Sequence, residues 1–455
     1  MIDRRQFMAS SLAAAVGAAE RRPNVLFLSV DDMNDYGFSG AYPSLSMPNL
    51  RKFRETAIAF DRAYCPSPVC VPSRASIFSG LFPHTTGSYW NGSDPWDKEP
   101  LRGMESMPEI FQRNGYATFG RGKLFHAPLP KEREEKMWDN KFFGGGFGPF
   151  PPEKDQRKGR FWGWTPWEGP DTDFPDVVNT SASVDFLKQK QEKPFFLALG
   201  FWRPHTPFTA PKRFFDLYAD AALPPGYKEN DLADVPAAAK ELAAVWGERF
   251  DAAKTQEWRA FVRAYLACTS FADWSCGRIL DALDSSPYRE STIVMFWSDN
   301  GYHCGEKNHW EKNTLWEKSA LTPMAIRIPG SKHAGKRCMR PVSLIDLYPT
   351  LVETCGLNKP KHTLEGRSLL PLLDKPDARW DRPALTTYGE HVASVRDDRY
   401  RYIRYADGSE ELYDHSLDPH EWENLASKPG MEAVKKRLGK AIPERWAPSL
   451  GGRLG

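Results

Sequence analysis

Continuous runs of hydrophobic residues alternate with amphipathic stretches along the chain as far as Thr354. Runs of this length are typical of strands that are buried on both faces of a parallel sheet. We expect strands at 24–30, 58–63, 116–120, 195–200 and 292–298, and a further strand that ends at Ile328. Stretches with helical spacing lie between them, at 48–56, 107–113, 177–190 and 257–283. The alternation predicts an α/β fold, with a large, mostly parallel sheet that is flanked by helices on both faces.

The pattern changes after Pro371. Short stretches at 393–396, 400–404 and 411–414 have the composition of antiparallel strands, and Asp407-Gly408 suits a hairpin turn. A terminal helix over 431–438 is expected to pack on these strands. We therefore divide the chain into a large domain over 21–373 and a C-terminal subdomain over 374–455, built from a small antiparallel sheet and a helix.

The first twenty residues have the features of an export signal. Arg4 and Arg5 precede a weakly hydrophobic stretch and small residues that end near Ala19. This pattern predicts a twin-arginine signal over 1–20, and hence a protein exported to the periplasm or the cell exterior. The alternative is a basic N-terminal tail. No later hydrophobic run is long enough to span a bilayer.

Acidic side chains directly follow the ends of two predicted strands. Asp31 and Asp32 come after the first strand, and Asp299 and Asn300 come after the strand at 292–298. Open α/β sheets place their sites at such strand ends, and two adjacent carboxylates repel each other unless a cation lies between them. Oxygen ligands favour calcium or magnesium over zinc. The alternative for Asp31-Asp32 is a solvated turn.

Cationic and titratable residues occupy comparable positions. Lys123 and His126 follow the strand at 116–120, and prolines on either side hold the turn around His205 extended. A lone lysine or histidine is usually solvated or paired in the core. Because these residues lie just beyond core elements, we place them, with Lys312, among the candidate site residues.

The segment from Cys70 to Gly80 predicts a short helix, with Pro72 near its start and Cys70 just ahead of its N-terminus. A helix start offers unpaired N–H groups and partial positive charge, which favour a bound anion or an anionic form of the residue there. Arg74 could reach back toward a tetrahedral oxyanion. The alternative is a buried thiol before a surface helix.

The string Cys-x-Pro-Ser-Arg at 70–74, followed by Ser79-Gly80, closely resembles the signature of the type I sulfatases, which have the alkaline phosphatase-like fold. The resemblance implies that a formylglycine-generating enzyme oxidises Cys70 to formylglycine, whose hydrated aldehyde attacks sulfur. It also implies one divalent cation, commonly calcium in that family, with magnesium as the alternative. The implied ligands are Asp31, Asp32, Asp299, Asn300 and the modified residue 70.

The resemblance further implies that Arg74 and Lys123 hold the formylglycine hydrate and that His126 is its base. His205 and Lys312 would grip the sulfate near the leaving oxygen. The chemistry of sulfate ester hydrolysis supports these roles. A sulfate ester carries negative charge that cations must neutralise, and a proton must be donated to the departing alkoxide. We assign that proton to His205, although the roles of the two histidines could be exchanged.

Among the sulfatases, the strings at 122–126 and 203–208 and the helix at 262–283 are most similar to the iduronate-2-sulfatase group. The resemblance runs from Arg22 to about Leu373, the catalytic domain, and implies a sulfated uronic acid in a glycosaminoglycan or an algal polysaccharide. The segment 128–175, rich in Gly, Pro and Trp, is a candidate wall for that carbohydrate. Packing of its aromatic residues onto the core is the simpler interpretation.

Composition excludes some classes and leaves two alternatives. A formal charge of +2 without a basic block argues against a nucleic-acid-binding protein, and seven irregularly spaced cysteines do not form a disulfide framework. A phosphomonoester, phosphodiester or phosphonate hydrolase of the same fold is the nearest rival. The other alternative is an exported protein that only binds anionic glycans and keeps Cys70 as a thiol.

Overall fold

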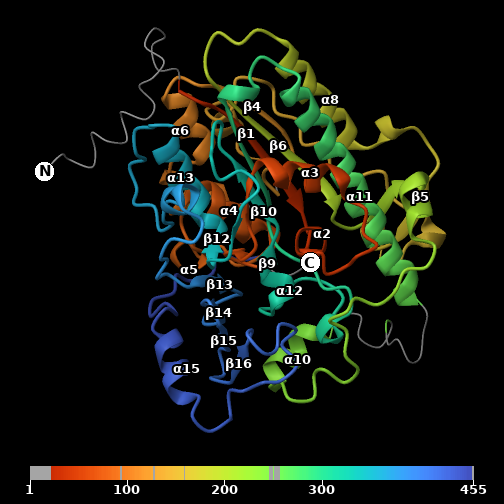
Figure 1. Cartoon of the computed structure of the whole chain (residues 1–455), viewed down its shortest axis with the longest axis vertical. Coiled ribbons are helices and arrows are strands. Elements are labelled where there is room, and N and C mark those ends of the chain that lie inside the picture. The colour runs from red at the N-terminus through yellow and green to blue at the C-terminus, as the bar shows by residue number, and fades with distance from the viewer. Residues whose placement is uncertain are drawn as a thin grey trace, which may run out of the picture.

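A seven-stranded sheet forms the centre of the molecule (Figure 1). The computed structural model describes residues 22–452 except 93–94, 127–128, 158, 245–249 and 251–256, so the predicted signal at 1–20 lies outside the described residues. In spatial order the strands are β11 (Arg337–Cys338), β2 (Ile58–Phe60), β10 (Met324–Arg327), β8 (Thr292–Ser298), β1 (Asn24–Asp31), β6 (Phe195–Pro204) and β4 (Ala117–Gly122).

Neighbouring strands β8, β1, β6 and β4 run parallel, whereas β10 is antiparallel to both of its neighbours. The prediction of a large, mostly parallel sheet is therefore confirmed. All residues of β1 are buried, as expected of a strand in the middle of the parallel group. Because parallel strands bring their carboxyl ends to one edge, Asp31, Lys123 and Asp299 meet at the same edge of the sheet.

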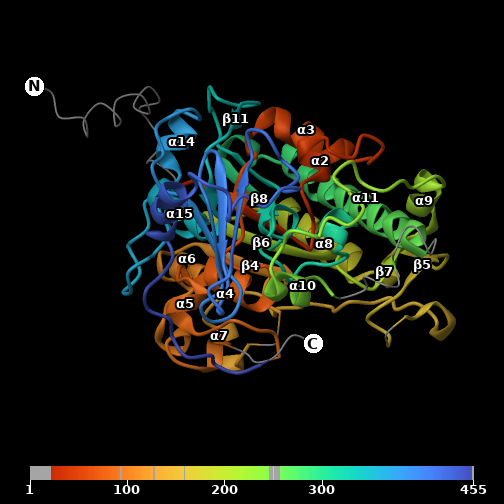
Figure 2. The same ribbon diagram turned by 90° about the horizontal axis from the view of Figure 1, so that it is seen from below.

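Helices cover both faces of this sheet (Figures 1 and 2). One layer contains α3 (Pro48–Thr56), α8 (Pro175–Lys188) and α11 (Glu257–Asp284), and the other contains α4 (Cys70–Ser79), α6 (Met107–Arg113) and α13 (Leu347–Thr354). Alternate residues of β1 point to the two layers, so that Leu26 and Leu28 join one core while Val25 and Phe27 join the other. The predicted flanking helices are confirmed.

The C-terminal subdomain contains a four-stranded antiparallel sheet and a helix, as predicted. Its elements are β13 (Ala384–Thr387), β14 (Ala393–Arg396), β15 (Tyr400–Arg404), β16 (Glu410–Asp414) and α15 (Glu432–Gly439). β13 is additional to the three predicted strands, and all of its residues are buried. Buried Arg401 on β15 joins this sheet to the large domain through Glu317 on α12 (Glu317–Ala320).

Among its described residues, the Trp-rich segment 128–175 contains one strand, β5 (Trp164–Trp167), which pairs in parallel with β7 (Phe208–Pro211). Trp164 is buried, and its ring lies 5.9 Å from that of Phe261 on α11. This tryptophan therefore packs onto the core, in agreement with the simpler interpretation of the segment. The pairing with β7 also attaches the segment to the chain that follows His205.

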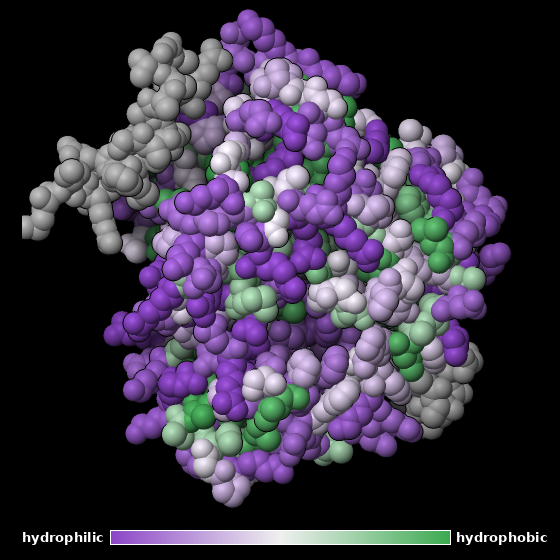
Figure 3. Space-filling model, in the orientation of Figure 1, coloured by the Kyte–Doolittle hydropathy of each residue, from purple (hydrophilic) through white to green (hydrophobic). Residues whose placement is uncertain are grey.

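Short elements connect these layers. They are α2 (Tyr36–Ser39), β3 (Ala63–Tyr64), α5 (Pro83–Thr86), α7 (Lys131–Glu134), α9 (Lys212–Phe215), α10 (Ala237–Ala243), β9 (Leu321–Thr322), β12 (Val342–Ser343) and α14 (Leu370–Asp374). The face seen in Figure 3 is mostly hydrophilic, with hydrophobic residues in small separate groups. Among the described residues, no helix is long and apolar enough to cross a membrane.

Candidate active site

Cys70 is the first residue of α4 and is completely buried at the carboxyl edge of the sheet. The sequence placed Cys70 just ahead of the helix, and this boundary is wrong by one residue. The helix starts earlier because the Ser73 amide donates a hydrogen bond to the carbonyl of Val69, 3.0 Å away, which closes the first turn around Cys70. Pro72 is tolerated there, since N–H groups of the first turn have no partner within the helix.

Polar groups of four residues from three segments surround the Cys70 sulfur. Sγ lies 2.9 Å from Lys312 Nζ, 3.4 Å from Asp31 Oδ1, 3.8 Å from Asn300 Oδ1 and 3.9 Å from Asp32 Oδ1. Burial, together with the charge of Asp31, raises the pKa of the Cys70 thiol well above its usual value. The thiol is therefore protonated at neutral pH, and a protonated thiol is a poor nucleophile.

Three carboxylates form one buried cluster. Asp31, Asp32 and Asp299 each offer an oxygen within 4.8 Å of the others. Asp32 has a left-handed backbone conformation (φ 64°), and its Oδ2 is buried without a hydrogen-bond partner in the described structure. A buried carboxylate oxygen without a partner is unfavourable, and a divalent cation would use it. The donor set therefore fits a hard cation such as Ca²⁺ or Mg²⁺.

Each carboxylate of the cluster contacts its own cationic side chain. Lys123 pairs with Asp31, Lys312 Nζ lies 2.5 Å from Asp32 Oδ1, and Arg74 Nε lies 2.8 Å from Asp299 Oδ2. Although burial alone would raise the pKa of Asp31, the charges of Lys123 and Arg74 hold it below its usual value. Burial outweighs the charge of Lys312 at Asp32 and raises its pKa to about 6. The cationic side chains thus stabilise the ionised form of the clustered carboxylates, which burial by itself would disfavour.

The two histidines lie at the side of this cluster. His205 Nε2 is 3.7 Å from Asp32 Oδ2, whereas His126 makes no hydrogen bond with any described residue and its Nδ1 is buried. Burial and the nearby charge of Lys123 lower the pKa of His126 to about 2 and that of His205 well below its usual value. Both imidazoles are therefore neutral at neutral pH in this structure, so each can accept a proton.

The structure thus brings all of the predicted site residues to one edge of the sheet. The family model described as "Sulfatase" matches residues 23–357. The chain belongs to the sulfatase family. A second model, described as "N-sulphoglucosamine sulphohydrolase, C-terminal", matches residues 305–446. The protein is thus a sulfuric ester hydrolase, as the sequence resemblance implied.

This sulfatase is 38% identical to a sulfatase of Formosa agariphila, in an alignment that covers 92% of the chain and 87% of the relative. It is 26% identical to human iduronate 2-sulfatase, over 74% of the chain and 70% of the relative. The solved structure of a phosphonate monoester hydrolase from Silicibacter pomeroyi has a TM-score of 0.73 and 22% identity, and covers 92% of this chain and 94% of that one. The similarity to this phosphonate monoester hydrolase concerns the fold alone.

Sequence reasoning missed two aromatic residues of the sulfatase site. The ring centroids of Phe147 and Trp202 lie 4.9 Å and 5.2 Å from Lys123 Nζ. The Phe147 ring also lies 4.8 Å from that of His205. Phe147 belongs to an irregular segment without periodicity, so no local signal distinguishes it from the other aromatic residues nearby.

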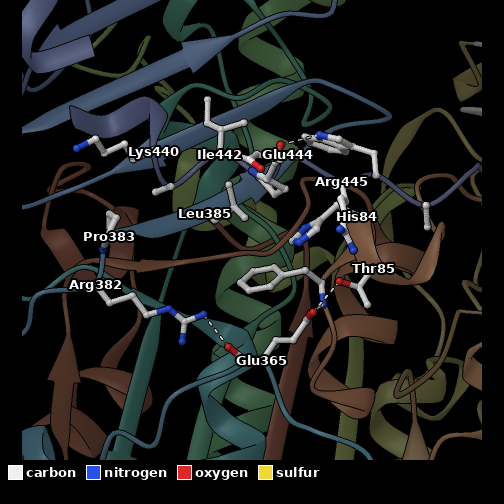
Figure 4. A pocket seen from close by; sticks show the side chains of 15 residues that line it. His84, Thr85, Glu365, Arg382, Pro383, Leu385, Lys440, Ile442, Glu444 and Arg445 are labelled. Carbon is white, nitrogen blue, oxygen red and sulfur yellow. Dashed lines mark hydrogen bonds between the residues drawn. The ribbon is translucent and has the colours of Figure 1, made fainter. Parts of the chain in front are cut away.

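A large cavity of the sulfatase is separate from this site (Figure 4). It has a volume of about 1020 Å³ and lies between α5 and the chain that follows α15. Its walls include Phe82, His84 and Trp446, and none of the predicted site residues lines it. Most of the site residues are almost completely buried, whereas His126 and His205 are half-buried, with 13% of the His205 side chain exposed.

Proposed function

We propose that this sulfatase hydrolyses sulfate esters on uronic acid or related sugar units of a sulfated polysaccharide or oligosaccharide. Residue 70 acts as formylglycine, formed by a formylglycine-generating enzyme, and a divalent cation, Ca²⁺ in the simplest case, is bound beside it. The observation that carries this proposal is the position of Cys70, at a helix start among three carboxylates and Lys312.

The surroundings of Cys70 argue against a role as an unmodified nucleophile. A thiolate would lie against the carboxylates of Asp31 and Asp32, and burial already opposes its formation. Formylglycine hydrate supplies the required chemistry, because one of its hydroxyls can attack sulfur and deprotonation of the other can expel sulfate. The protonated thiol therefore favours the modified residue over an unmodified cysteine nucleophile, and membership of the sulfatase family argues against the glycan-binding alternative.

The carboxamide of Asn300 completes the proposed cation site. Its Nδ2 donates hydrogen bonds to Asp32 Oδ1 and to the carbonyl of Gly301, both at 2.8 Å. These bonds orient its Oδ1 toward the Cys70 sulfur, 3.8 Å away, beside the three carboxylates. Asp31, Asp32, Asp299 and Asn300 would thus hold the cation, and Arg74, Lys123 and Lys312 would neutralise the sulfate and residue 70.

The uronic acid substrate is supported by the similarity to human iduronate 2-sulfatase, which spans most of both chains. A phosphonate monoester hydrolase has the same fold, but at 22% identity it supports no substrate. The proposed substrate is therefore a sulfated sugar with a carboxylate nearby, and no specific observation favours a phosphate or phosphonate ester.

Substitution of His205 tests its proposed role as the proton donor to the leaving oxygen. Because His205 is neutral in this structure, it must first take up a proton, and the negative charge of a bound sulfate ester favours that uptake. We expect His205→Ala to lower kcat/KM for a sulfated sugar by about 10²-fold, because a sugar alkoxide is a poor leaving group that needs a proton. An aryl sulfate, whose phenolate leaves without one, should lose less than about 10-fold. Steady-state kinetics with both substrates give this comparison.

The matched variant is His126→Ala, since His126 is the proposed base. Its loss of kcat should be similar for the sugar and the aryl sulfate, because expulsion of sulfate from residue 70 follows departure of either leaving group. If instead His126→Ala shows the strong dependence on the leaving group and His205→Ala does not, the two roles are exchanged.

A further inference from the structure

Arg160 is an exposed residue of the segment 128–175 and packs against two aromatic rings that contact each other. Its guanidinium carbon is 4.9 Å from the ring centroid of Phe150 and 5.0 Å from that of Phe161. Phe161 is 39% exposed, which is unusual for so large a hydrophobic side chain. Among the described residues, no carboxylate forms an ion pair with Arg160, so its positive charge faces solvent.

Phe161 is attached by a hydrogen bond to the turn that carries His205. The Thr206 hydroxyl donates a hydrogen bond to the carbonyl of Phe161 at 2.5 Å. The Phe147 ring lies 5.5 Å from the Phe161 ring and 4.8 Å from the His205 ring. A series of contacts through Phe161 and Phe147 therefore connects Arg160 to His205 of the active site.

Two nearby arginines are already engaged within the protein. Arg157 Nε lies 2.5 Å from Glu257 Oε1, and buried Arg203 donates to the carbonyl oxygens of Phe147 and Thr209. These two side chains have structural partners, whereas Arg160 has no hydrogen-bond partner among the described residues, so its N–H donors are available to another group. A guanidinium that packs against the faces of aromatic rings can keep its planar edge of donors free, and this edge matches a carboxylate in a bidentate manner.

We propose that Arg160, Phe150 and Phe161 form a substrate subsite for the carboxylate of a uronic acid unit near the sulfate ester. The exposed ring of Phe161 would contact the apolar face of that sugar. The inference rests on the proposed function, because it requires an anionic carbohydrate at the catalytic residues. A sulfate on a neighbouring sugar would offer the same negative charge, so the experiment separates the two sources.

The test compares wild type, Arg160→Ala and Arg160→Lys on three substrates. These are a sulfated uronate oligosaccharide, the same oligosaccharide with its carboxylates reduced to alcohols, and 4-nitrophenyl sulfate. For Arg160→Ala, we expect the ratio of kcat/KM between the intact oligosaccharide and the aryl sulfate to fall by about 10–100-fold, mainly through KM, since a charged hydrogen-bond partner is lost. Arg160→Lys should be intermediate, because lysine keeps the charge without the planar donors. With the carboxyl-reduced substrate the three proteins should not differ.

Lys154→Ala is the matched control, since Lys154 is an exposed cation of the same segment and contacts neither ring. This variant should keep the wild-type ratio. An unchanged ratio for Arg160→Ala, with the aryl sulfate still hydrolysed, overturns the subsite alone. An equal loss on the carboxyl-reduced substrate overturns the carboxylate assignment in favour of a neighbouring sulfate. If wild type hydrolyses neither sulfate ester, the proposed function fails and the subsite with it.

Discussion

In a Cys70→Ala variant, sulfate release should fall by at least about 10⁴-fold, as expected when the nucleophile of a covalent mechanism is removed. Alanine cannot be converted to an aldehyde, and the Cys70 sulfur is completely buried, so no surface residue can replace it. The fold should persist, because the substitution removes a single sulfur atom, whose shortest polar contact is with Lys312 Nζ at 2.9 Å. Ion chromatography of released sulfate and thermal unfolding measure the two effects separately.

Cys355→Ala is the control for loss of a buried thiol. Cys355 lies at the end of α13, is 2% exposed and is absent from the site. This variant should retain activity and lose on the order of 1 kcal/mol of stability, the usual effect of deleting a small buried group. Sulfate release by the Cys70→Ala protein at a rate near that of Cys355→Ala would refute the nucleophile assignment.

The second large effect concerns the cation site. Asp299→Ala removes one of three clustered carboxylates and frees Arg74, whose Nε lies 2.8 Å from Asp299 Oδ2. We expect metal content and activity to fall together, with a loss of kcat/KM of about 10³-fold, because a bound cation contributes several kcal/mol of transition-state stabilisation. Elemental analysis after gel filtration, in parallel with turnover, measures both quantities.

Asp281→Ala is the matched control, since it removes the same charge from the exposed surface of α11, where Asp281 pairs with Lys52. This protein should keep its metal and its activity. Wild-type metal stoichiometry in Asp299→Ala would remove Asp299 from the ligand set. Chelation followed by addition of Ca²⁺ or Mg²⁺ to the wild type then identifies which cation restores turnover.

Several elements were predictable because their signals are local. The helix α6 coincides with the predicted range, since a proline lies in its first turn and Asn114-Gly115 follows its last residue. The positions of Asp31 and Asp299 followed from the rule that parallel strands end at the same edge. Their contacts with Lys123 and Arg74 were not predictable, because residues far apart in sequence meet only in the folded sheet.

The features that were missed depend on contacts between distant segments. β5 exists because it pairs with β7, and nothing in the sequence around Trp164 indicates that partner. Phe147 and Arg160 lie in the same irregular segment, and only its attachment to the turn at His205 shows that they are near the site. The sequence indicated the catalytic chemistry, whereas the proposed substrate wall required the structure.

Mass spectrometry of the peptide that contains residue 70 tests the central claim most directly. The protein would be produced together with a formylglycine-generating enzyme and treated with a thiol-alkylating reagent. We expect a peptide about 18 Da lighter than the thiol form, the difference between a thiol and an aldehyde, that resists alkylation and reacts with a hydrazide. A fully alkylated thiol at residue 70, in a preparation that still hydrolyses sulfate esters, would contradict the account.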